Sequence, residues 1–280
     1  MRMFFAKAAV LSLLMSTTGV VGSAQAAPLD DAYFALRSGD YDRALTLVMP
    51  YAENGVPFAQ YVVGAIMDGG FGSPQSRPEE AVVWYKRAAE KGHPEAQTAL
   101  ARCYEQAHGI AQDYAEARKW YAAASEQDIR EAKYGLAVLH SRGLGGPKDE
   151  GSAVSLSRRA AEQGHTGAQV FLANLLSTAD DIPHDNIEAV KWFREAAESG
   201  HPEGQLGLGV AYRDGSGVEA DIVISYVWFQ IALKNRQLDA IDPSARGVLT
   251  TDIERIGASF PPQVRTRADQ LVTKWVAKRG

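Results

Sequence analysis

The residues of this chain that could carry catalysis or hold a metal ion are few: six histidines and one cysteine. His93, His165 and His201 are separated by multiples of 36 residues, so they stand at one phase of a repeat. Copies in phase lie one repeat apart rather than around one ion, and we expect them to open helices instead. Cys103 has apolar neighbours, which is typical of a buried structural thiol rather than a nucleophile.

No catalytic sequence motif accompanies these residues. The patterns Gly-x-Ser-x-Gly, Ser-x-x-Lys and His-Glu-x-x-His do not occur in the sequence. The acidic pairs stand where helix caps and solvated turns account for them. We therefore expect no catalytic residue, no cofactor and no metal site, and a protein that is not an enzyme.

One row of residues is suited to binding another protein. Basic side chains recur at one position of the repeat, and aromatic side chains occupy the position immediately before it. Arginine and aromatic residues carry much of the binding energy at protein interfaces, so we predict a partner-binding row; the alternative is an ordinary solvated helix face. The row consists of Tyr85, Lys86, Tyr121, Arg158, Phe193, Arg194 and Phe229.

The elements that position this row follow from a regular period. A small residue restarts a helical pattern every 36 or 37 residues, with a large apolar residue three positions later and a residue that is nearly always alanine seven positions later. That spacing places all three on one face of a helix, and the period is typical of a solenoid of helix pairs. The restarts are Ala44, Ala81, Ala117, Ala153, Ala189 and Ser225.

The sequence also indicates where these helices begin and end. An aspartate stands four residues before most restarts, where its carboxylate can cap the first turn, and Arg77-Pro78 replaces it once. A glycine ends the helix in most copies, and Asp128 takes its place in the third. A second helix follows each stop, so we expect about six antiparallel helix pairs.

The segment from Ala81 to Gln97 (AVVWYKRAAEKGHPEAQ) resembles the Sel-1-like repeat, a relative of the tetratricopeptide repeat. The resemblance covers residues 40–236. It implies an all-α, right-handed superhelical solenoid, and by analogy with tetratricopeptide grooves the helix that opens at each restart lines the concave surface. It further implies a bacterial protein that binds other proteins.

Both ends of the repeat region are expected to be covered by capping helices, as a solenoid requires. Residues 27–39 form a half-repeat pattern before the first restart, and we assign them to an N-terminal capping helix. The period is lost after the last restart, and residues 237–280 are assigned to C-terminal capping helices, near 244–258 and 262–277.

The N-terminus has the pattern of a secretory signal peptide over residues 1–26. Two basic residues precede an apolar run that is too short to span a membrane, and small residues place cleavage between Ala26 and Ala27. Without Arg2 and Lys7 the 29 basic residues become 27, against 34 acidic ones. We therefore expect a periplasmic or secreted protein with no membrane span in the mature chain and no nucleic-acid partner.

The resemblance implies a non-enzymatic scaffold or regulator in envelope signalling or polysaccharide control, which binds a membrane sensor or an envelope-assembly component. The alternative is an envelope protein that binds peptidoglycan or exported polysaccharide. A third hypothesis is β-lactam binding or hydrolysis, known in a branch of the family with paired cysteines in each repeat. Cys103 is the only cysteine here, so that role does not carry over. The oligomeric state stays open.

Overall fold

The computed structural model describes residues 23–74, 76–235, 238 and 245–277, so most of the predicted signal peptide lies outside the described residues. Within these ranges the regular structure is helical, apart from one isolated β-bridge between Asp68 and Ser76. None of the described helices is long and apolar enough to cross a membrane.

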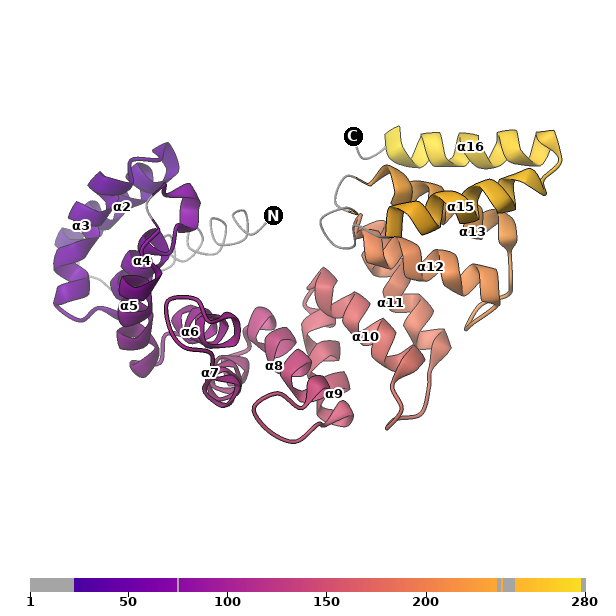
Figure 1. The fold of residues 1–280 in the computed structure, drawn as a ribbon. Helices are drawn as coiled ribbons and strands as arrows, with labels where there is room; N and C mark the ends of the chain where they lie inside the picture. The colour runs from indigo at the N-terminus through magenta and orange to yellow at the C-terminus, as the bar shows by residue number, and fades with distance from the viewer. Residues whose placement is uncertain (1–22, 75, 236–237, 239–244, 278–280) are drawn as a thin grey trace. The chain divides into compact units, whose positions relative to one another are not determined.

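The chain divides into two compact units, residues 1–147 and 148–280 (Figure 1). The N-terminal unit contains α2 (Ser23–Ser38), α3 (Tyr41–Glu53), α4 (Pro57–Met67), the 3-10 helix η2 (Gly70–Gly72), α5 (Pro78–Glu90), α6 (Pro94–Gln106), α7 (Tyr114–Glu126) and α8 (Arg130–Arg142). The C-terminal unit contains α9 (Glu150–Glu162), α10 (Thr166–Thr178), α11 (Asn186–Glu198), α12 (Pro202–Asp214), α13 (Ile222–Lys234), α15 (Ala245–Ala258) and α16 (Pro262–Ala277).

Within each unit, every helix packs against the next one along the chain up to α13, which packs against both α15 and α16. We call α3, α5, α7, α9, α11 and α13, which open at the restarts, the leading helices, and α4, α6, α8, α10 and α12 the following helices. The expectation of an all-α solenoid is confirmed, and the handedness of its superhelix stays a prediction.

Capping side chains fix the starts of the leading helices. Five aspartates accept hydrogen bonds from backbone N–H groups of the first turn, which satisfies donors that the helix itself leaves free. Arg77 stands at the same place before α5, with Pro78 as the first helical residue. The five caps are Asp40, Asp113, Asp149, Asp185 and Asp221.

The stops of the leading helices are equally local. Gly55, Gly92, Gly164 and Gly200 follow the helix ends with positive φ, a conformation that glycine adopts without steric cost. Asp128 replaces glycine after α7 and still adopts φ of +68°. Its carboxylate pairs with Lys133, whose side chain is buried, so this ion pair accompanies the unfavourable backbone conformation.

A row of buried polar residues joins the helices of each pair, and it escaped sequence analysis. In three copies the glutamine side-chain amide donates to a carbonyl at the end of the leading helix, at 3.1 to 3.4 Å. Gln127 and Asn235, from the next leading helix, donate to the glutamine in front of them. The row is Gln60, Gln97, Lys133, Gln169 and Gln205.

The turn that ends the fourth repeat, after α10, differs from the turns that end the neighbouring repeats. There a glycine, such as Gly145, lies against the first turn of the leading helix so closely that an added Cβ would fall 2.2 Å from a backbone oxygen. Asp181 stands at this position after α10, and its N–H donates to the buried carboxylate of Glu150 at 2.8 Å. Lys148 pairs with both carboxylates, so polar contacts replace glycine packing here.

The ends differ in part from expectation. α2 begins at Ser23, packs against α3 and runs through the predicted cleavage site at Ala26 and Ala27, so that site and its processing stay predictions. In the described residues there are five complete pairs rather than six, because α15 and α16 cover α13 in place of a following helix. These two helices have almost the predicted bounds. Part of the predicted capping segment, 237, 239–244 and 278–280, lies outside the described residues.

Candidate functional site

The aromatic half of the predicted partner-binding row is buried, which corrects the prediction of an exposed row. Tyr85, Tyr121, Phe193 and Phe229 are 2 to 8% exposed. Each ring lies against a glycine of a following helix, close enough that a Cβ there would sit 2.4 to 2.8 Å from it. The position four residues after each of these restarts faces the neighbouring helices, so these rings belong to the core. The four glycines are Gly64, Gly135, Gly207 and Gly209.

The basic half of the row is only partly open. Lys86 is exposed on α5. Arg158 forms an ion pair with Glu188 on α11, and Arg194 donates to the Tyr212 hydroxyl at 3.0 Å. Two of the three cations are thus engaged inside the C-terminal unit, and partner binding by the row stays a prediction.

Trp84, Trp120 and Trp228 are less buried than the aromatic residues that follow them, whereas Trp192 and Phe193 are equally buried, at 7 and 8% exposed. Trp120 and Trp192 donate their indole N–H to Glu116 and Glu188, both at 3.0 Å. A lysine lies over each ring, with its Nζ 5.3 and 5.2 Å from the ring centroid. The N–H and one face of each indole are therefore already in contact with the protein.

Cys103, His93 and His165, which could act as a nucleophile or as metal ligands, have structural roles in the fold. Cys103 is 4% exposed, and burial raises the pKa of its thiol to about 12. His93 and His165 cap α6 and α10 by accepting a backbone N–H at Nδ1, as the sequence predicts for helix-entry residues. Within the described ranges no three of the His, Cys, Asp and Glu side chains are grouped as metal ligands.

A second candidate surface, distinct from the predicted partner-binding row, runs along the following helices. Positions spaced by 3, 4 and 3 residues form one stripe along each helix, because that spacing returns to the same face. In the N-terminal unit this following-helix stripe is rich in charged and aromatic side chains. It comprises Phe58, Tyr61, Ala65 and Asp68, then Glu95, Thr98, Arg102 and Glu105, then Glu131, Tyr134, Val138 and Ser141.

Buried tyrosines fix the carboxylates at the end of this stripe. The Tyr85 hydroxyl donates to Asp68 at 3.3 Å, and His108 Nε2 lies 2.6 Å from the other oxygen of that carboxylate. The Tyr121 hydroxyl donates to Glu105 at 2.8 Å. The tyrosines that the sequence placed on a binding surface therefore act from beneath it, by orienting acids that reach the surface.

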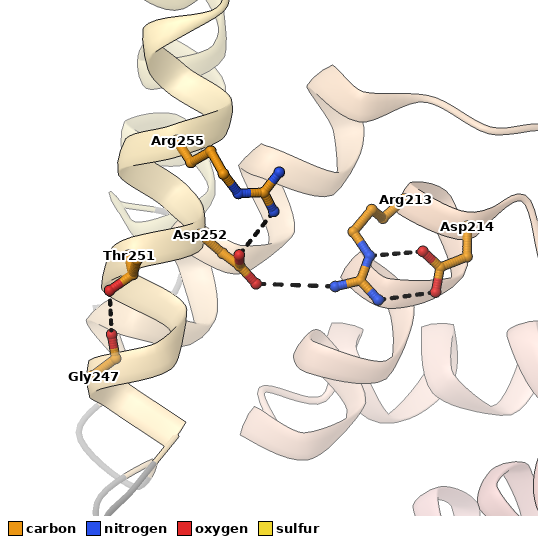
Figure 2. A network of polar contacts seen from close by, with 6 residues as sticks. All are labelled: Arg213, Asp214, Gly247, Thr251, Asp252 and Arg255. Carbon is orange, nitrogen blue, oxygen red and sulfur yellow. Dashed lines mark hydrogen bonds and ion pairs between the residues drawn. The ribbon is translucent and has the colours of Figure 1, made fainter.

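The same stripe in the C-terminal unit has no aromatic residue and fewer charged ones, and it ends in a closed network. Its last member, Arg213, donates to both oxygens of Asp214 at 2.7 and 2.9 Å, as Figure 2 shows. Arg213 also lies 4.0 Å from Asp252 of α15, which accepts a hydrogen bond from Arg255 at 2.8 Å. This end of the stripe is thus joined to the capping helix α15. The stripe comprises Gly167, Val170, Asn174 and Ser177, then Glu203, Leu206, Val210 and Arg213.

Paired helices with in-phase caps, stops and buried rings define an α-solenoid repeat protein. A family model described as the Sel1 repeat matches residues 57–93, 94–129, 130–165, 166–201 and 202–235, more than half of the sequence. The chain therefore belongs to the Sel1 repeat family, whose solenoids typically serve as scaffolds for protein interaction.

Two solved structures resemble the chain. One is a protective antigen of uropathogenic Escherichia coli with an SLR fold, 28% identical, with a TM-score of 0.74 over 84% of this chain and 49% of that one. The other is a Sel1 repeat protein from Oxalobacter formigenes, 27% identical, with a TM-score of 0.62 over 76% and 59%. The chain thus spans about half to three fifths of these relatives. No protein of curated function matches it.

The family model begins each repeat with the following helix, whereas the sequence analysis began each repeat with the leading helix. Its repeats begin at residues 57, 94, 130, 166 and 202, the first residues of the following helices. The tetratricopeptide analogy, which assigns the groove to the first helix of a repeat, then favours the following helices. α6 contacts α8 and α10 contacts α12, so consecutive following helices also pack side by side within each unit.

Proposed function

We propose that this protein is an exported, non-catalytic scaffold or regulator that binds a protein partner in the bacterial envelope. The observation that carries the proposal is the following-helix stripe, in which side chains from consecutive repeats form one surface of charged and aromatic groups. A solenoid presents such a surface without a catalytic cleft.

Two further features support this role. Residues 1–26 have the composition of a secretory signal, which favours the periplasm or the exterior over the cytoplasm. His93 and His165 cap helices and Cys103 lies in the core, as described above.

The alternative, binding of peptidoglycan or polysaccharide, has less support. Sugar rings commonly stack on exposed aromatic faces, and the tryptophans that a glycan could use already contact lysine and glutamate. Trp84 is likewise covered by Arg87, whose Cζ lies 4.6 Å from the ring centroid.

The test is to express the full chain with its own residues 1–26, crosslink intact cells, and identify the products by mass spectrometry. Recovery of one envelope protein in stoichiometric amount, from the periplasmic fraction, is the expected result. Recovery of cell-wall fragments alone, or binding to isolated sacculi that matches the binding to envelope proteins, would replace the scaffold by the glycan binder.

A further inference from the structure

The helix pair α3 and α4 leaves a hollow at a place that is closed in most later repeats. There the turn after the following helix packs on the first residue of the leading helix, so that a Cβ added to Gly145 would fall 2.2 Å from the Tyr114 carbonyl oxygen. Gly72 stands at this position after α4. A Cβ added to Gly72 would meet the Tyr41 hydroxyl at 3.1 Å and no backbone atom within 4 Å. The turn therefore stands off the start of α3.

The connection from α4 to α5 explains the gap. The restarts Ala44 and Ala81 are 37 residues apart, one more than the later ones. The connection contains the 3-10 helix η2 and the β-bridge between Asp68 and Ser76, a local structure that accommodates the extra length. The space between this connection and the start of α3 has a volume of about 400 Å³.

The hollow combines an apolar interior with charges of both signs. Ile66, at the end of α4, is 1% exposed and lies deepest, and Leu45 of α3 is partly buried beside the hollow. Asp42, in the first turn of α3, is exposed and lies at the rim. Arg77, at the start of α5, also lines the hollow. The negative and the positive charge thus come from two different helices.

The Asp42 carboxylate is not used by the fold. The backbone carbonyl of Asp42 accepts from the Thr46 hydroxyl at 2.8 Å, whereas its carboxylate has no hydrogen bond or ion pair with any described residue. Asp40 differs, because its Oδ1 accepts the N–H of Arg43 at 3.2 Å and caps α3. Asp42 is therefore available to a ligand that brings a positive charge.

The Arg77 guanidinium is used at one nitrogen. Its Nη1 pairs with Glu80 at 3.2 Å, and its buried Nε has no acceptor among the described residues. Arg77 also gives α5 no side-chain cap, whereas aspartates cap the other described leading helices. The guanidinium and the uncapped start of α5 together favour a negative group at this end of the hollow.

We propose that the hollow binds a zwitterion of about the size of a dipeptide, with its ammonium group on Asp42 and its carboxylate on Arg77. An apolar side chain of the ligand packs on Leu45 and Ile66 between the charged ends. Liquid water fills about 30 Å³ per molecule, so the hollow has room for roughly 13 non-hydrogen atoms, and alanyl-leucine has about 14. The inference goes beyond the proposed protein-binding role and does not depend on it.

The next repeat supplies a matched control. Glu79 stands two residues before the restart Ala81, as Asp42 stands two before Ala44, and it is exposed. The turn over its helix is closed, because a Cβ added to Gly109 would fall 2.3 Å from the Pro78 carbonyl oxygen. Glu79→Gln removes a charge close to Arg77 without touching the lining, so it separates direct contact from a general effect of local charge.

The experiment is an NMR titration of the full chain with alanyl-leucine, its N-acetyl form and its C-terminal amide. Alanyl-leucine is expected to bind with a Kd below about 1 mM, and each blocked form about tenfold more weakly, as for the loss of one charge-assisted hydrogen bond. Asp42→Asn should lose the preference over the N-acetyl form and keep the preference over the amide, and Arg77→Gln should do the reverse. Glu79→Gln should bind as the wild type does.

Unchanged melting temperatures verify that the variants fold. No binding of alanyl-leucine up to about 10 mM, or equal binding of the free and the blocked forms, would overturn the proposal. It would also be overturned if Glu79→Gln weakened binding as much as Asp42→Asn, because the effect would then be one of local charge rather than contact. A preference over the N-acetyl form that survives in Asp42→Asn would contradict the assigned ammonium site.

Discussion

The two units are built from the same helix pair and differ in what lies beneath and upon their following helices. In the N-terminal unit Tyr85 and Tyr121 fill the core position, and their hydroxyls reach the acids of the stripe. In the C-terminal unit Phe193 and Phe229 fill the same position with no hydroxyl, and the stripe above them has no aromatic residue and fewer charged ones.

The hydroxyl oxygen of these rings is one difference between the two units, beside the residues of the stripe itself. Each ring packs on a helix glycine, so the backbone accepts phenylalanine and tyrosine alike. A tyrosine at this place connects the core to a carboxylate and holds that carboxylate in one orientation, which is a condition for recognising a partner. The comparison teaches that repeats with similar packing can differ in the polar groups that their core residues present to the stripe.

The largest expected effect concerns the covered end of the C-terminal unit. Deleting residues 245–280 removes α15 and α16 and exposes the faces of Tyr226 and Phe229, which are 1 and 2% exposed in the full chain. We expect aggregation, because the terminal helix of a solenoid needs a polar cover. Size-exclusion chromatography with light scattering would show it, and a soluble monomer with full helix content would show that α13 needs no cap.

The next largest effect compares the unfolding free energy lost at the two aromatic positions of the leading helices, three and four residues after the restart. Phe193→Ala is expected to cost about 3–5 kcal/mol of unfolding free energy, as for a buried aromatic ring on a glycine. Trp120→Ala should cost roughly half as much, since the indole is partly exposed and hydrogen-bonded to Glu116. Urea unfolding of both variants measures the difference; a larger cost for Trp120 would reverse the core assignment.

A smaller effect is the pH dependence caused by His93. Burial lowers its pKa from 6.5 to about 4 in the folded chain, so below pH 6.5 the unfolded chain binds a proton that the folded chain does not. Stability from this group is complete above pH 6.5 and falls by roughly 3 kcal/mol as the pH approaches 4. Denaturant titrations from pH 7.5 to 4.5 measure the loss.

His93→Asn provides the matching control, because asparagine can cap α6 and does not titrate. The loss of stability between pH 6.5 and 4.5 should shrink in this variant. An unchanged slope would mean that other groups dominate acid unfolding.

The smallest effect tests the hydroxyl oxygen that differs between the units. Tyr121→Phe removes the hydrogen bond to Glu105 at 2.8 Å and leaves the ring in place, so we expect a loss of about 1 kcal/mol. The reciprocal change Phe193→Tyr places a hydroxyl where Ser177 stands instead of an acid, and should gain nothing. A gain in stability there would show that the C-terminal unit can build the same link.

The sequence was a good guide wherever structure is local. The aspartate caps, the glycine stops and the substitution by Asp128 act within one helix turn, and all adopt the predicted role. The two C-terminal helices were also foreseen, since Pro262 and the apolar spacing mark them without reference to the rest of the chain.

The candidate surface could not be foreseen in the same way. Tyr85 and Lys86 are adjacent in sequence, and periodicity alone does not decide which of the two faces a neighbouring helix, because α5 packs against α4 on one side and α6 on the other. The hydrogen bonds from Gln127 to Gln97 and from Asn235 to Gln205 join residues that are 30 positions apart, so no local pattern announces them. The signal that could have found the stripe is its charge contrast between early and late repeats.

The most direct test of the account uses the one repeat position that is Tyr134 in the N-terminal unit and Leu206 in the C-terminal unit. A photoreactive phenylalanine derivative is placed at either position in the full chain, the cells are irradiated, and the crosslinked partner is measured by quantitative mass spectrometry. The account predicts a partner adduct from position 134 and little from position 206. An adduct from 206 and none from 134 would contradict it and place binding on the stripe of the C-terminal unit.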